Sequence, residues 1–286
     1  DQLHDWQINH GSLQFTYQND YCLFDSYDLN ITHNYIPFSD VEVSAEGTLG
    51  QFGGFDLNGI DVSSIMPFGL LFSSLSEADI NYISALEIGG KLNKIGLKVE
   101  KPGELTVNAN IDAFNNQAVG VIPGVSDANI SVTSNKQSGH ATIKLGQQEI
   151  HFDGQFNRPM PLQQGDFELN WTNNEEGFEL ISKKSLLVTD ELNSLSQFSL
   201  FFPSESATDT SPILNLYAYA SLNDASKAQH YFPVHAMGED VFDYLQPTLK
   251  KGTVTGAKVL WSGRISDYPF TENQGVPAKN NRNFKK

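Results

Sequence analysis

Regular alternation of apolar and polar residues is the feature that most limits how this chain can fold. It is clearest at Leu105, Val107, Ala109 and Ile111, which are separated by polar residues. Successive side chains of a strand point to opposite faces, so a period of two places the apolar residues on one face. The same period returns at residues 13–18, 29–32, 41–46, 141–145, 167–172 and 198–202. The sequence therefore predicts a mainly β protein made of consecutive antiparallel strands.

Two segments follow a helical period instead. In residues 76–88, Ser76 and Asp79 have the spacing of a helix cap, an apolar stripe follows, and Gly89 and Gly90 end the pattern. The second segment is residues 237–251. Each of the two is expected to form a short amphipathic crossover helix between strands.

The second helical segment has acidic residues in its first turn, Lys250 and Lys251 in its last, and Gly252 directly after it. Pro247 lacks an N–H group and crowds the preceding turn, so the helix is expected to kink or break near Gln246.

The order of helix, glycine and strand thus occurs twice, which is typical of a repeat array. We expect an elongated, curled antiparallel β-sheet, groove-like and of repeat type. A sheet this wide must curl, and its apolar face then forms either a closed core or a groove. The expected division is a β meander at 1–62, a helical crossover at 63–89, the main antiparallel block at 90–236, the second helix at 237–251, a strand opening the next repeat at 252–270, and a tail at 271–286 that is disordered or not native.

Ten apolar residues of the alternating segments are expected to line one continuous surface. They are Leu105, Val107, Ile111, Ile143, Leu145, Phe167, Leu169, Trp171, Phe198 and Leu200. Residues 214–222 are apolar on both faces, so this strand is expected to be covered on both sides.

Charge and cysteine content narrow the function classes. The 286 residues carry a formal net charge of -16, which disfavours binding to nucleic acid or to an anionic membrane surface. Cys22 is the single cysteine, so no disulfide can form within the chain. The chain starts at Asp1 without a signal peptide or a long apolar run and is expected to be a piece of a longer protein.

No pattern of residues indicates catalysis, a metal site or a cofactor. His230 and His235 have a spacing that suits neither one helical face nor a standard zinc pair. Glu175 with Glu176, and Asp25 with Asp28, are better explained as solvated turn residues than as catalytic pairs.

Several motifs resemble those of the AsmA-like proteins of Gram-negative bacteria, from about residue 1 to residue 276. The motif at 257–263, followed by Tyr-Pro-Phe at 268–270, is the most specific; 85–91, 122–125, 158–162 and 231–234 also match. Two departures are Ser262, where an aromatic residue or histidine is common, and the basic tail from Pro277, to which nothing is carried over.

The resemblance implies a segment of a long periplasmic protein, anchored in the inner membrane by a transmembrane helix outside this fragment. Such proteins are expected to conduct phospholipids to the outer membrane, with acyl chains held in a β-sheet groove. The ten residues of the apolar surface would then bind lipid, without cofactor or nucleic acid, and protein partners stay open.

Two other classes remain. A carbohydrate-binding or protein-binding β-sandwich would explain the strands and the acidity, but Trp171 and Trp261 fall on apolar faces, which disfavours sugar stacking. A glycosidase would need two carboxylates facing a cleft.

Overall fold

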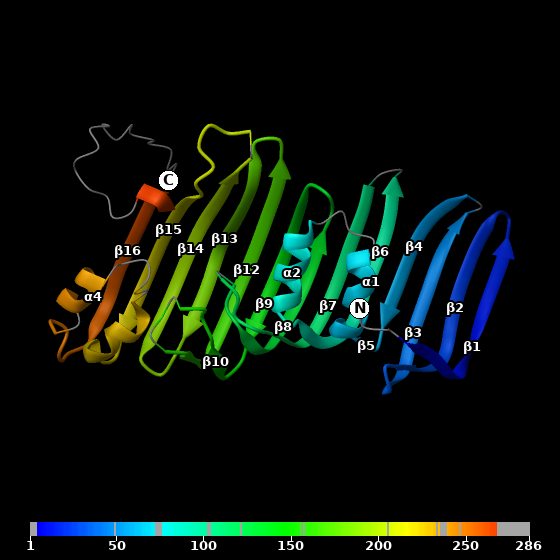
Figure 1. The fold of residues 1–286 in the computed structure, drawn as a ribbon, viewed down its shortest axis with the longest axis horizontal. Coiled ribbons are helices and arrows are strands. Elements are labelled where there is room, and N and C mark those ends of the chain that lie inside the picture. Colours follow the sequence, from blue (N-terminus) through cyan, green and yellow to red (C-terminus); the bar gives the residue numbers. More distant parts are fainter. Residues whose placement is uncertain are drawn as a thin grey trace.

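One open antiparallel sheet of 14 strands dominates the structure, which is a computed structural model describing residues 5–267 except 49, 72–75, 102–103, 121, 155, 157, 205, 233, 235–238 and 246. The strands lie side by side in chain order along the molecule, from β1 to β16 (Figure 1). A separate sheet contains only β10 and β11. The prediction of a mainly β, elongated antiparallel sheet is confirmed, and the described residues contain no second large sheet that would make a sandwich.

The strands of the N-terminal half form hairpins around the helical crossover. They are β1 (Trp6–Gln18), β2 (Tyr21–His33), β3 (Ile36–Thr48), β4 (Gln51–Asn58), β5 (Ile60–Asp61), β6 (Gly89–Lys101), β7 (Glu104–Asn116) and β8 (Val125–Ser134).

The C-terminal half continues the same sheet. Its strands are β9 (Ser138–Leu145), β12 (Gln164–Asn174), β13 (Gly177–Val188), β14 (Leu192–Pro203), β15 (Ile213–Leu222) and β16 (Val254–Arg264), with the hairpin β10 (Gln148–Ile150) and β11 (Met160–Leu162) between β9 and β12.

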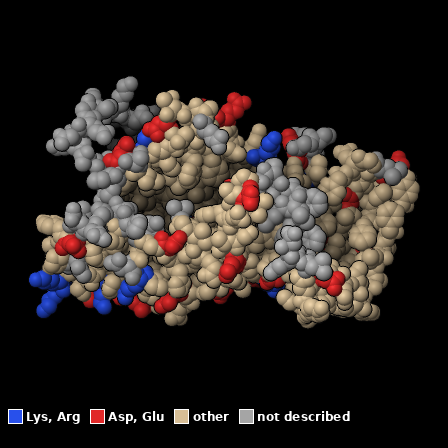
Figure 2. Space-filling view, in the orientation of Figure 1, with Lys and Arg blue, Asp and Glu red and all other residues tan. Residues whose placement is uncertain are grey.

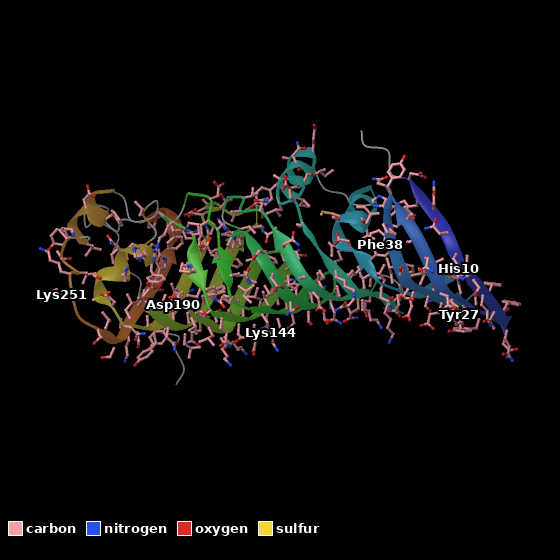
Figure 3. All side chains as sticks on the ribbon, turned by 90° about the horizontal axis from the view of Figure 1, so that it is seen from below. His10, Tyr27, Phe38, Lys144, Asp190 and Lys251 are labelled. Carbon is pink, nitrogen blue, oxygen red and sulfur yellow. The ribbon has the colours of Figure 1, made fainter. Side chains whose placement is uncertain are left out.

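The helices are short and lie on one side of the large sheet (Figure 3). They are α1 (Val62–Leu71), α2 (Glu77–Ala85), the 3-10 helix η1 (Ala225–Tyr231), α4 (Glu239–Leu245) and the 3-10 turn η2 (Ile265–Asp267). Ser76 caps α2 as its sequence predicts: its hydroxyl accepts a hydrogen bond from the Asp79 N–H, and the Asp79 carboxylate accepts one from the Ser76 N–H. The expected tail at 271–286 lies outside the described residues.

The register of the strands defines two faces, because residues directly opposite each other in an antiparallel pair share a face. We call the face that contacts the helices the inner face and the opposite one the outer face. Figure 3 shows Phe38 on the inner side and Tyr27 and Lys144 on the outer side. The strand pairing agrees with this assignment of Phe38 to the inner face, since Phe38 is directly opposite Ile31 of β2, a member of the cluster against which Ile65 of α1 packs.

Tightly buried residues gather at one end of the strands, where small elements cover the inner face. Three clusters form there. The first contains Leu29, Ile31, Val41 and Ile60, against which Ile65 of α1 packs; in the second, Ala128 and Leu145 of the large sheet pack with Ile150, Met160 and Leu162 of the β10–β11 hairpin; in the third, Leu192 and Leu222 pack with Ala228 of η1. The core of this protein is therefore a band along one edge of the sheet, and it leaves the rest of the inner face outside the band.

The outer face is mostly polar in its N-terminal half. The Lys94 ammonium lies 3.2 Å from the Asp56 carboxylate, and the Thr133 hydroxyl lies 2.7 Å from the Asn108 side-chain oxygen.

The expectation that β15 is covered on both sides is wrong. Tyr217 and Tyr219 point outward and are 37% and 46% exposed, because nothing in the described residues packs over the outer face there.

Candidate functional site

The inner face is apolar across the width of the sheet, and all ten residues of the predicted apolar surface lie on it. One row runs directly across four strands, from Ile111 through Ile130 and Ile143 to Phe167. Trp171 opposes Leu180 of β13, which in turn opposes Leu200 of β14. The remaining members follow by the period of two within their strands, so the structure brings the whole predicted set together on one face.

Most of this surface is only partly covered. Of the ten residues, Leu145 alone is buried, at 6% exposure, while Leu105 is 41% exposed and the other eight are intermediate. A closed sandwich core would seal such residues at close packing. Exposed apolar area of this extent marks a binding groove or an interaction surface rather than a core.

A hollow is visible on the inner side over the C-terminal strands (Figure 2). At the other end, a depression of about 330 Å³ is lined by Phe15, Cys22, Phe24, Ala45 and Phe52, among others. Phe15 is 65% exposed there. We use the name groove for the inner face between these two ends.

Several apolar groove residues were not part of the predicted set. They include Leu13, Phe15, Phe24, Leu180, Phe178, Leu216 and Trp261, which register places on the inner face. The alternation at residues 13–18 already places Leu13 and Phe15 on one face. The face on which Leu180, Leu216 and Trp261 lie relative to the predicted set follows only from the pairing of their strands.

Hydrogen bonds connect α2, the loop after β7 and the β10–β11 hairpin along that edge of the sheet. We call these three connected segments the rim. The Tyr82 hydroxyl of α2 donates to the Val119 carbonyl at 3.0 Å, and the Gly120 N–H donates to the Asp153 carboxylate at 3.0 Å. Gly124 and His151 exchange two backbone hydrogen bonds of 2.9 Å. These contacts connect α2 to the β10–β11 hairpin through the loop after β7.

The rim is fastened to η1 by side chains from three separate segments. Arg158, which precedes β11, donates from Nη2 to Nδ1 of His230 at 2.5 Å. The Thr189 hydroxyl lies 2.5 Å from the Tyr231 oxygen, and Tyr231 donates to a Glu191 carboxylate oxygen at 2.8 Å. Tyr231 also packs against the cluster that contains Met160 and Leu162, so residues of the motif at 158–162 and the first residue of the motif at 231–234 lie together.

Burial and charge set the protonation of this contact. Burial, with a smaller contribution from the Glu191 acceptor, raises the pKa of Tyr231 to about 12, so the phenol keeps its proton. Burial and then the Arg158 cation lower the pKa of His230 below its ordinary value. A neutral imidazole is the form that can accept the hydrogen bond from Arg158.

The other polar residues considered from the sequence do not converge on a common site. Glu175 and Glu176 lie in the exposed turn between β12 and β13, Asp25 lies on β2, and Asp28 lies at a bulge of β2 with a φ of 50°. His235 lies outside the described residues. None of the helices in the described part of the chain is both long enough and apolar enough to cross a membrane.

Comparison with known proteins identifies the family of this chain. Residues 1–277 match the model of the family described as YhdP protein. The chain is also similar to the intermembrane phospholipid transporter YhdP of Escherichia coli strain K12, with 25% identity over 165 residues. That match covers 56% of this chain but 13% of the transporter, so the chain corresponds to a small part of its relative. No solved structure matches. Since the family match extends over nearly the whole chain, the chain belongs to the YhdP family.

Proposed function

We propose that this chain is a segment of a protein that conducts phospholipids between the inner and outer membranes, and that its groove holds the acyl chains. The observation that carries the proposal is the apolar inner face, which continues across the sheet and is still partly exposed. Membership of the YhdP family, and the similarity to a protein named as a phospholipid transporter, support a lipid as the cargo.

The physical basis is the burial of methylene groups. Each acyl CH₂ that leaves water contributes about 0.8 kcal/mol, so a chain lying on the groove is held without directional contacts. We infer that Leu105, Val107, Ile111, Ile143, Leu145, Phe167, Leu169, Trp171, Phe198 and Leu200 bind lipid. The other inner-face residues named above extend the same surface.

The charge of the chain bears on the headgroup. With 18 basic residues against 34 acidic ones, the chain offers few partners for phosphate, so we expect little selectivity among headgroups. We infer a role in the periplasm, within a protein anchored to the inner membrane by a transmembrane helix elsewhere in the longer chain. We assign no catalytic role, cofactor or nucleic-acid partner.

The test is lipid binding by the purified segment, measured by native mass spectrometry after incubation with vesicles of mixed phospholipids. The segment should retain phospholipid, and Leu105→Asp should lose most of it because a carboxylate keeps its water in the groove. The matched control is Leu195→Asp, since Leu195 is 47% exposed but points to the outer face. A wild-type segment free of lipid, or equal loss in both variants, would contradict the proposal.

A further inference from the structure

Trp171 lies on the inner face near the end of β12, one inward-facing position before the polar turn to β13. On β12, the inner-facing residues before it are Phe167 and Leu169, and the next one after it is Asn173, followed by the turn to β13. Opposite Trp171 stands Gly139, beside Ser138 at the start of β9. Trp171 is therefore the last large apolar side chain of β12, although Phe178 of β13, directly opposite Asn173, continues the apolar face on the next strand.

The indole lies in the space that this glycine leaves open. A Cβ atom at position 139 would lie 2.1 Å from Cζ2 and 2.3 Å from Cε2 of Trp171, so the ring occupies the space that a side chain would need. Nε1 is bonded to Cε2 and therefore lies near the same contact. The indole nitrogen thus lies over β9, close to the polar end of β12.

The N–H group of this indole has no acceptor among the described residues, and its nitrogen is not sealed from solvent. Trp261, which also lies on the inner face, differs because its Nε1 donates to the Gly263 carbonyl at 3.4 Å. Trp171 therefore offers a free donor near the polar end of β12, whereas Trp261 does not.

We propose that the Trp171 N–H donates a hydrogen bond to an ester carbonyl of a bound glycerolipid, which rests on the proposed function. The acyl chains then lie over Leu169 and Phe167, and the headgroup extends past Asn173 into water. Tryptophan suits this position because its ring is apolar and its N–H seeks a polar partner. Trp171 is thus a specificity-determining residue that selects ester-linked lipids and sets their orientation.

The experiment is a competition in native mass spectrometry between a diester phosphatidylcholine and its diether analogue with the same chains and headgroup. The wild-type segment should prefer the diester about fivefold, as expected for one hydrogen bond to a neutral acceptor. Trp171→Phe should bind both lipids equally, because phenylalanine keeps the flat ring but lacks the donor. Trp261→Phe, the matched control, should keep the preference.

Equal binding of the two lipids by the wild type, or a preference that survives Trp171→Phe, would overturn the inference. Failure to bind any lipid would count against the proposed function instead. A second measurement leaves position 171 unchanged. In the variant Trp6→Phe/Trp261→Phe, lipids brominated near the ester should quench the remaining fluorescence more than lipids brominated near the chain end, and the reverse order would contradict the proposed orientation.

Discussion

The indole of Trp171 on β12 lies directly over Gly139 on the neighbouring strand β9, with the ring in the space of the missing side chain. Two residues 32 positions apart therefore share one place on the inner face. This pair also explains why a residue without a Cβ is found inside a strand, where glycine is otherwise unfavourable.

Replacing this glycine should force the ring away from the sheet. We expect Gly139→Val to lower the free energy of unfolding by about 2 kcal/mol, within the range of overpacked sites. Urea unfolding measures the change. Gly146→Ala is the control, since nothing lies within 4 Å of a Cβ there. An unchanged free energy of unfolding in Gly139→Val would contradict this prediction, because the indole could then adopt another position without loss of stability.

A charge in the centre of the groove tests how far the inner face is open. Ile143 is partly buried and packs against the cluster beneath the β10–β11 hairpin. We expect Ile143→Asp to cost about 2 kcal/mol of stability, less than for a fully buried site, because its carboxylate keeps part of its water. Urea unfolding is again the measurement, with Asn129→Asp, exposed and opposite Lys144 on the outer face, as control. Complete unfolding of Ile143→Asp would indicate a closed core.

The hydroxyl of Tyr231 should contribute to the attachment of the rim. Tyr231→Phe removes the hydrogen bonds to Glu191 and Thr189 and should lower the free energy of unfolding by about 1 to 2 kcal/mol. Tyr244→Phe, whose side chain is 72% exposed on α4, should change it little. Hydrogen exchange of η1 would locate the effect, and unchanged exchange there would contradict it.

Acidification should loosen the same attachment. The pKa of His230 is lowered in the folded state by burial, then by Arg158 and Lys227, while Glu191 opposes the shift. The unfolded state therefore takes up a proton at higher pH than the folded state, so this stabilisation is complete above the ordinary value of about 6.5 and is lost as the pH falls below it. The urea midpoint should decrease between pH 7.5 and 5.5. His230→Gln should decrease less over that interval, and an equal decrease would exclude His230 as the cause.

The alternation of residues predicted the fold class because its period depends on local backbone geometry. The similarity of the motifs to AsmA-like proteins also pointed to the right family, as the match over residues 1–277 confirms. The rim was not predicted, because β10 and β11 have three residues each and η1 has seven, too few for a period to be recognised.

The groove was predictable within each strand but not between strands. The register between β12 and β13 shifts at Glu168 and Leu169, and that between β13 and β14 shifts between Ser182 and Ser185. Each bulge changes which residues oppose each other, and no local signal specifies it. Whether ten apolar residues share one face therefore depends on pairing across the whole sheet.

The open arrangement of the strands has a consequence for stoichiometry. Thirteen strands follow one another from β1 to β16 at a spacing of roughly 4.8 Å, which makes the groove about 58 Å long. Acyl chains that lie along the strands, as proposed for β12, would stand side by side along this length. A groove of this length would hold several lipids in single file, and each new lipid that entered would displace the ones ahead of it.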